Sequence, residues 1–316
     1  MPTLSFDASK LSRPIARVKG GRYDGEILYL NEDGHEGVVR KPEARFNASR
    51  YAPALKGLKP AERTRALIRL EEAFVKKLPT EHLIGETDTV RDLYEQIKKD
   101  ATADKRIVLD DEGMFEPIPT TDPKRRDCYY IAGQSGSGKS YIAKGLAEHY
   151  HKLWPDREVY LVSKLEQDDT LDACKFIKRI KIQSFVDDYP DLEEFRNCFI
   201  IFDDYDTLSG DSGKVVAKII DDLGIQGRHT VTQMACLSHY LTNYKATRLI
   251  LSETTHIVVY PQSTAYHPLK YLLKNYVGVD EEDIKRHRKN GSRWLLYGKG
   301  HPSYMLSQKD CELLHT

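Results

Sequence analysis

An eight-residue stretch combines glycines, hydroxyl residues and one lysine at the spacing G-x-x-x-x-G-K-[ST]. Its glycines permit the backbone angles that turn successive N–H groups inward, toward an anion. Lys139 would reach the β- and γ-phosphates of a nucleotide, and Ser140 would ligate Mg²⁺. The stretch therefore predicts a phosphate-binding loop with ATP and Mg²⁺ as its ligands. Its residues are Gly133, Gln134, Ser135, Gly136, Ser137, Gly138, Lys139 and Ser140.

The residues on either side of this loop supply the context that such a loop needs. The segment "DCYYIAG" before it is typical of a buried strand, and "SYIAKGLAEHYHKL" after it is typical of a helix. A helix N-terminus favours negative charge, so the helix would add to the binding of phosphate. An ordinary Gly-Ser linker lacks these neighbours. The signal is strong for nucleotide binding, but it does not indicate the type of reaction.

An acidic pair follows a second apolar run. In "NCFIIFDDYDTLSG", the four residues Phe199–Phe202 would form a strand that delivers Asp203 and Asp204 to its carboxyl end. Ligands bind at that edge of open α/β sheets. We expect Asp203 to hold the magnesium ion with Ser140, and Asp204 to orient or deprotonate an attacking water. The simpler alternative is a solvated acidic turn.

The segment "IQGRHTVTQMACLSHYL" (225–241) carries the remaining candidates. Its strand would place Ser238 and His239 at the phosphate edge, where a polar side chain can sense the γ-phosphate. Arg228 would lie at the opposite end of that strand, more than about 20 Å away at about 3.3 Å per residue. It could then serve only a neighbouring subunit, as an arginine finger supplied in trans. A surface arginine at a helix C-terminus is the alternative.

The wider pattern predicts two regions. Residues 1–120 mix short β-like runs ("GEILYL", "EGVVRK") with two amphipathic helical stretches, and we expect a small α+β accessory domain there. Residues 121–316 alternate apolar runs with helices, which indicates a mostly parallel sheet covered on both faces. The expected strands are Asp127–Ala132, Glu158–Ser163, Cys198–Asp203, Thr230–Leu237 and His256–Tyr260. The fold class is thus α/β, a RecA-like P-loop NTPase preceded by a small N-terminal domain.

Composition excludes several classes of protein. The chain has 316 residues, with 48 Lys and Arg against 48 Asp and Glu, so a globally basic nucleic-acid coat protein is not expected. The five cysteines are scattered without a CxxC pair, which favours buried, reduced thiols over disulfides or zinc. No window contains eighteen consecutive apolar residues, and the N-terminus does not resemble a signal peptide. We expect an intracellular protein without membrane insertion.

The motifs together carry a family resemblance. The set "GQSGSGKS", "FIIFDD" and "GRHTVTQMACLSHY" resembles the FtsK–HerA superfamily, and most of all the poxvirus-type genome-packaging ATPases of large nucleocytoplasmic DNA viruses. The tail, "YHPLKYLLKNYVGVDEEDIKRHRKNGSRWLLYGKGHP", resembles the C-terminal helices and tryptophan strand of that family. The similarity covers about 125–308, and the first ~120 residues lie outside it.

The resemblance implies an ATP-hydrolysing motor that pushes double-stranded DNA into a capsid. It implies a homo-oligomeric ring, a pentamer or hexamer, that docks on a capsid or portal protein in the host cytoplasm (viral factory) or the virion. Carried over by position, the catalytic residues are Lys139, Asp204, Arg228 and His239, with Arg248 as the second finger candidate. Channel loops rich in Lys and Arg would contact DNA, with "KRHRKNGSR" (285–293) as one candidate.

One departure from the family keeps other readings open. The family usually has glutamine where this chain has His239, and Ser238 could share the sensor role. A histidine can still donate a hydrogen bond, and it would make turnover depend on pH where imidazole titrates. The alternatives are another P-loop enzyme, such as a nucleotide kinase, or a non-hydrolysing nucleotide-binding capsid scaffold. DNA stimulation of ATP hydrolysis would distinguish the motor from both.

Overall fold

The computed structural model describes the chain except for residues 34–39, 41–45, 47, 103–104 and 315–316. The β-like run 36–41 lies almost wholly outside the described residues. The strands and helices are β1 (Thr3–Ser5), β2 (Ser12–Lys19), β3 (Ile27–Asn31), α1 (Ala48–Tyr51), α2 (Pro60–Val75), α3 (Asp88–Thr102), β4 (Arg106–Val108), β5 (Met114–Pro117), β6 (Cys128–Ala132), α4 (Lys139–Leu153), β7 (Val159–Ser163), β8 (Ile177–Ile180), α5 (Ile182–Asp187), β9 (Phe199–Asp203), α6 (Gly210–Thr230), β10 (Gln233–Ser238), α7 (Tyr244–Glu253), β11 (His256–Val259), α8 (Tyr266–Leu272), α9 (Glu281–Lys289), β12 (Leu295–Gly298), β13 (Ser303–Ser307) and β14 (Asp310–Leu314).

A ten-stranded sheet in the order β4-β14-β13-β12-β11-β6-β10-β9-β7-β8 forms the centre of the molecule. Its strands run parallel from β11 to β8, and the pairings from β11 through β12, β13 and β14 to β4 are antiparallel. The parallel strands β6, β9 and β10 are buried along their whole length. Continuous burial is what a sheet covered on both faces requires, and it explains the unbroken apolar runs in the sequence.

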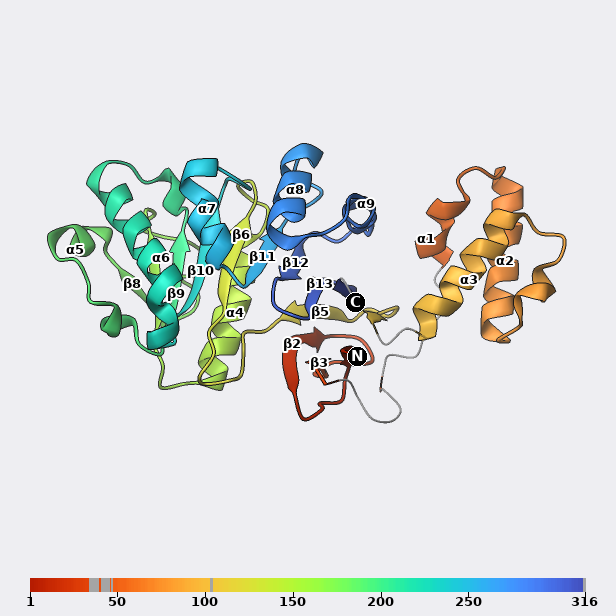
Figure 1. Cartoon of the computed structure of the whole chain (residues 1–316), viewed down its shortest axis with the longest axis horizontal. Coiled ribbons are helices and arrows are strands. Elements are labelled where there is room, and N and C mark those ends of the chain that lie inside the picture. The colour runs from red at the N-terminus through yellow and green to blue at the C-terminus, as the bar shows by residue number, and fades with distance from the viewer. Residues whose placement is uncertain (34–39, 41–45, 47, 103–104, 315–316) are drawn as a thin grey trace.

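Different elements cover the two faces of this sheet. One face packs on α4 and on the small antiparallel sheet β1-β3-β2-β5, as residues such as Tyr129, Leu146 and Leu28 share one buried cluster. The other face packs on α6, α7, α8 and α9, with Phe202 and Ile219 in a second cluster. Figure 1 shows these layers. The predicted α/β fold class, with a small antiparallel sheet at the N-terminus, is confirmed.

A helical unit made of α1, α2 and α3 has a core of its own. Its buried residues, such as Leu70, Ala73 and Tyr94, form a cluster separate from the two that flank the large sheet. The Tyr94 hydroxyl donates to the carbonyls of Ala73 and Leu78, each at 2.8 Å. This unit lies apart from both sheets in Figure 1. The proposed domain boundary at residue 120 stays a prediction, because strand pairing does not show which parts fold independently.

The structure corrects one expected strand and adds others. The strand expected at Thr230–Leu237 is wrong at its start, because α6 continues to Thr230 and β10 begins at Gln233. The "GRH" segment is therefore the last helical turn, which ends where Val231 takes a left-handed φ of 54°. Strands β1, β2, β8 and β14 are additions to the expected set, and β4 pairs with β14 at one edge of the large sheet. The five cysteines are buried free thiols, as the sequence indicated.

Candidate functional site

The phosphate-binding loop lies between the end of β6 and the start of α4. Gly136 and Gly138 have φ of 73° and 110°, which side chains with a Cβ rarely adopt. Gly133 has no room for a Cβ, because the Tyr260 ring and the Ser137 Oγ would lie 2.6 and 2.7 Å away. The loop folds as predicted because its glycines stand where the backbone requires them.

Lys139 begins α4, and its amino group turns back over the loop. The side chain is buried, and Nζ donates to the carbonyl oxygens of Gly133 at 3.0 Å and Gln134 at 3.5 Å. The Ser137 Oγ is buried without a hydrogen-bond partner among the described residues. A buried donor without a partner costs free energy, so this hydroxyl fits a site that receives an oxygen-rich ligand. Lysine, hydroxyl and loop amides together match the donor set for phosphate.

Asp203 ends β9 and is buried. Its Oδ2 accepts a hydrogen bond from Ser163 Oγ at 3.1 Å. Burial, reinforced by the neighbouring Asp204, raises the pKa of Asp203 to about 6. A divalent cation beside the carboxylate would favour its charged form. Asp203 and Ser140 carry oxygen atoms of the kind that Mg²⁺ prefers as ligands.

Three elements converge at Asp204. This residue follows β9 with a left-handed φ of 47°. Its Oδ1 lies 2.9 Å from His239 Nε2, just after β10, and 3.9 Å from Lys139 Nζ of α4. The sheet order explains the meeting, because β10 lies directly between β6 and β9. A carboxylate held by two nitrogens next to a phosphate loop is placed to orient water.

The geometry separates the two sensor candidates. Ser238 is buried, and its Oγ donates to Asp206 Oδ2 at 2.8 Å. The backbone N–H of His239 donates to the same oxygen at 2.7 Å. Ser238 therefore helps to fix the end of β10, whereas the imidazole of His239 contacts Asp204. The arrangement favours His239 as the sensor.

The structure does not bring the arginine candidates to the loop. Arg228 is exposed in the last turn of α6 and lines the same cavity as Asp127, which precedes β6, whereas the loop follows the end of that strand. Arg248 lies in α7, on the face opposite α4. Lys139, Ser140, Asp203, Asp204 and His239 thus gather at one edge of the sheet, and Arg228 lies at the other.

One arginine that contacts the phosphate loop was not predicted from the sequence. Arg293, between α9 and β12, donates from Nε to Ser137 O at 2.9 Å and from Nη2 to Gly136 O at 3.2 Å. It thereby ties two carbonyls of the loop to the C-terminal region of the chain. The sequence indicates Arg293 only as a member of the basic run 285–293, a candidate DNA contact. No local motif marks its role at the loop, because the contact joins residues 156 and 157 positions apart.

The loop after β6, the acidic end of β9 and the strand between them define a RecA-like P-loop NTPase. Over 221 residues the chain is 32% identical to the uncharacterized protein V3 of Sputnik virophage, covering 69% of this chain and 89% of that protein. The chain belongs to the same family as this virophage protein. No protein-family model matches the chain.

Three solved structures show a likeness of fold. The genome packaging NTPase B204 of Sulfolobus turreted icosahedral virus 2, in complex with AMPPCP, is 12% identical, with a TM-score of 0.40 over 59% of this chain and 98% of that one. The cytoplasmic domain of the type VII secretion ATPase EccC of Thermomonospora curvata is 12% identical, with a TM-score of 0.42 over 64% and 28%. The pCW3 conjugation coupling protein TcpA is 11% identical, with a TM-score of 0.41 over 94% and 77%.

No helix in the described part of the chain is long and apolar enough to cross a membrane.

Proposed function

We propose that this chain is an ATP hydrolase that drives double-stranded DNA into a viral capsid as a homo-oligomeric ring. The observation that carries the hydrolytic part is the meeting of Asp204 with His239 Nε2 at 2.9 Å and Lys139 Nζ at 3.9 Å beside the phosphate loop. The packaging part rests on the motifs that resemble packaging ATPases and on kinship with a virophage protein. The proposed setting is therefore an infected cell, its viral factory or the virion, with a capsid or portal protein as partner.

Each residue of the site has a part in the proposed mechanism. The loop amides and Lys139 would bind the phosphates of ATP, and Ser140 and Asp203 would hold a magnesium ion. When bound, Mg²⁺ would supply positive charge that stabilises the reacting phosphate. Asp204 orients a water molecule toward the γ-phosphorus and accepts its proton, and His239 keeps the carboxylate in place.

Arg228 is the proposed trans-acting residue. Its place at the sheet edge opposite the loop rules out contact with the γ-phosphate of its own chain, but leaves it exposed to a neighbour. A cation delivered to the developing charge would accelerate hydrolysis by roughly 10³–10⁵. Arg248 stays the second candidate. The ring, pentamer or hexamer, follows from this requirement for a neighbour.

The test of the whole proposal is phosphate release from ATP, measured with and without duplex DNA. We expect duplex to stimulate release by the wild-type chain, and Lys139→Ala and Asp204→Asn to abolish it. Asp204→Asn should still bind ATP, because the asparagine leaves the loop and Lys139 intact. Hydrolysis unaffected by duplex would contradict the motor. Tight ATP binding without release by the wild-type chain would support the nucleotide-binding scaffold instead.

The trans arrangement has a separate test. Arg228→Ala should lose turnover and retain nucleotide binding. Mixing it with Lys139→Ala should restore part of the activity. In a mixed ring, some subunit interfaces combine an intact phosphate loop from one subunit with an intact Arg228 from its neighbour. Arg248→Ala, mixed in the same way, is the matched comparison. Near-normal turnover by Arg228→Ala alone would show that Arg228 is not the trans-acting arginine.

A further inference from the structure

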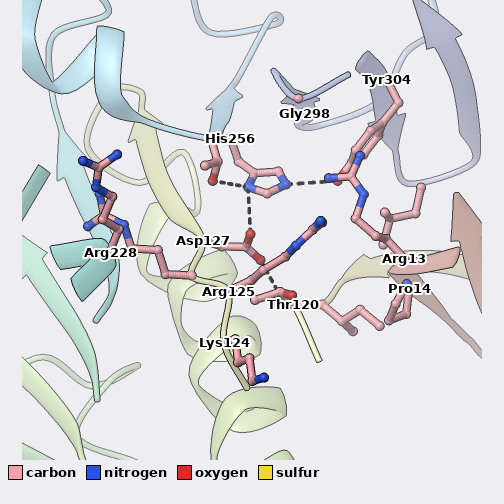
Figure 2. Close-up of a pocket in the computed structure, with 15 residues that line it drawn as sticks. Arg13, Pro14, Thr120, Lys124, Arg125, Asp127, Arg228, His256, Gly298 and Tyr304 are labelled. Carbon is pink, nitrogen blue, oxygen red and sulfur yellow. Dashed lines mark hydrogen bonds and ion pairs between the residues drawn. The ribbon is translucent and has the colours of Figure 1, made fainter. Parts of the chain in front are cut away.

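A cavity of about 350 Å³ lies at the edge of the large sheet opposite the phosphate loop. Its walls come from β2, from the segment that precedes β6, and from the ends of β11, β12 and β13 that face the small sheet. Figure 2 shows cationic side chains around it, with Arg228 on one side, Arg13 on the other, and Lys124 and Arg125 nearby. Pockets for small ligands start at about 300 Å³, so this one has room for a ligand.

The charge of the lining is strongly positive. Of its five Lys and Arg residues, Arg126 is bound to α6, where it donates to Gly224 O at 2.6 Å. Arg13, Lys124, Arg125 and Arg228 remain directed to the cavity or its rim. Among the described lining residues only Asp127 is acidic. The cluster therefore favours an anion.

Asp127 offsets one positive charge of this cluster, and both of its carboxylate oxygens have other partners. Its Oδ2 accepts hydrogen bonds from the Thr120 N–H at 2.6 Å and the Tyr129 hydroxyl at 3.1 Å. Its Oδ1 lies 3.9 Å from Nδ1 of His256. Arg125 has an exposed acidic neighbour, Asp122, at 3.6 Å, which is a weak surface pair. The carboxylates near these cationic side chains thus either have other hydrogen-bond partners or form only weak surface pairs.

Arg13 supplies a second, independent sign of a ligand. Its Nε pairs with Glu32 at 2.7 Å, but its buried Nη2 has no hydrogen-bond partner among the described residues. Buried polar groups are nearly always hydrogen-bonded, and an unpaired guanidinium N–H costs free energy. An oxygen-rich anion in the cavity would supply the missing acceptor.

The remaining wall is apolar. Pro14, Ile15 and Ile118 line it together with the ring of Tyr304, whose hydroxyl lies 3.1 Å from His256 Nε2. An inorganic anion would gain nothing from apolar contacts with this wall, whereas an organic group attached to a phosphate could pack against it. We propose that this cavity binds a small phosphorylated molecule of about nucleotide size, with its phosphate on Arg13, Lys124 and Arg125.

The test is calorimetric titration of the full chain with AMP as the probe. The Lys139→Ala background weakens the phosphate loop, so that binding to this cavity can be observed by itself. Arg125→Glu is the diagnostic change, since Arg125 is exposed and its replacement should leave the fold intact. The matched control is Arg65→Glu, an exposed arginine on α2 far from the cavity in the chain. Circular dichroism confirms that each variant is folded.

We expect AMP to bind to Lys139→Ala, and Arg125→Glu to weaken that binding by roughly ten- to a hundredfold, as for hydrogen bonds to charged groups. Arg65→Glu should have no effect. Absence of AMP binding, or unchanged affinity in Arg125→Glu, would overturn the site. Equal affinity for inorganic phosphate and AMP would contradict the proposal that the ligand has an organic group. Displacement of AMP by a short DNA duplex would show that the cavity binds DNA instead. Arg228 is left unchanged, so the outcome is independent of the finger proposal.

Discussion

At the scale of single residues, the site depends on contacts that side-chain type alone does not specify. His239 stands where the family that the motifs resemble is expected to carry glutamine, and its Nε2 contacts Asp204 Oδ1. Both side chains can donate one hydrogen bond in this direction. The structure therefore explains how a histidine can replace glutamine in the proposed mechanism, namely by holding the carboxylate that orients water.

His239→Gln tests this interpretation. We expect turnover within about threefold of wild type, because the amide still donates to Asp204. His239→Ala should lower turnover by roughly ten- to a hundredfold, the usual value of a hydrogen bond to a charged group. The measurement is the rate of phosphate release at saturating ATP, with ATP affinity as the control. Wild-type rates in the alanine variant would show that the contact is not needed.

At the scale of elements, α6 shows how a tertiary contact accounts for a glycine inside a helix. Gly224 and Gly227 favour an early end to the helix, since glycine disfavours helix. In the structure, a Cβ on Gly227 would collide with Nη1 of Arg126, whose guanidinium binds the carbonyls of Leu223 and Gly224. Glycine at this position lets the arginine reach these two carbonyls, which lie inside the helix before its end at Thr230. The arginine adds a donor to carbonyls that a helix already bonds internally.

Two other helical glycines provide a matched pair of substitutions. A Cβ added to Gly145 of α4 would meet no other atom within 4 Å, whereas a Cβ on Gly213 of α6 would lie 2.8 Å from Leu208 O. Gly145→Ala should stabilise by about 0.5–1 kcal/mol. Gly213→Ala should destabilise by about 1–3 kcal/mol, because the backbone must move. Thermal unfolding midpoints measure both, and shifts of the same sign would contradict the packing.

At the scale of the whole molecule, a buried ionic cluster joins the C-terminal strands to α9. Glu312 of β14 accepts hydrogen bonds from His287 and from both terminal nitrogens of Arg286, at 2.6 and 2.7 Å for Arg286. Arg106 of β4 lies 3.6 Å from Glu312 and pairs with Asp310. Segments from residue 106 to residue 312 are thereby held at one edge of the sheet.

This cluster predicts a loss of stability in acid. Burial alone would raise the pKa of Glu312, but its hydrogen bonds with His287 and Arg286 lower that pKa to about 2. The ionised group thus contributes stability above its unfolded pKa of about 4.5, and loses it as pH falls toward 2. The contribution is on the order of 3 kcal/mol.

Glu312→Gln removes this contribution. We expect the variant to be less stable than wild type at neutral pH, with a smaller further loss between about pH 5 and pH 2. The measurement is the denaturation midpoint as a function of pH, and Glu71→Gln, an exposed glutamate of α2, is the control. Parallel pH profiles for wild type and Glu312→Gln would show that the cluster does not titrate as described.

The sequence by itself determined the phosphate loop and the acidic strand. Both are local patterns, Gly133–Lys139 and Phe199–Asp204, in which the backbone or the adjacent ligand requires each residue type. The parallel sheet could also be predicted locally, because buried strands require continuous apolar runs. Strands β1, β2, β8 and β14 were not predicted, since their pairing depends on neighbours elsewhere in the chain.

Only the tertiary structure decided which distant residues meet. The contact of His239 with Asp204 depends on β10 lying between β6 and β9, and that of Arg293 with Ser137 joins the loop to the C-terminal region. The cationic cavity likewise needs Arg13 and Arg125 to converge from distant parts of the chain. Spacing along a chain fixes local backbone form, but contacts between distant residues arise only when elements pack.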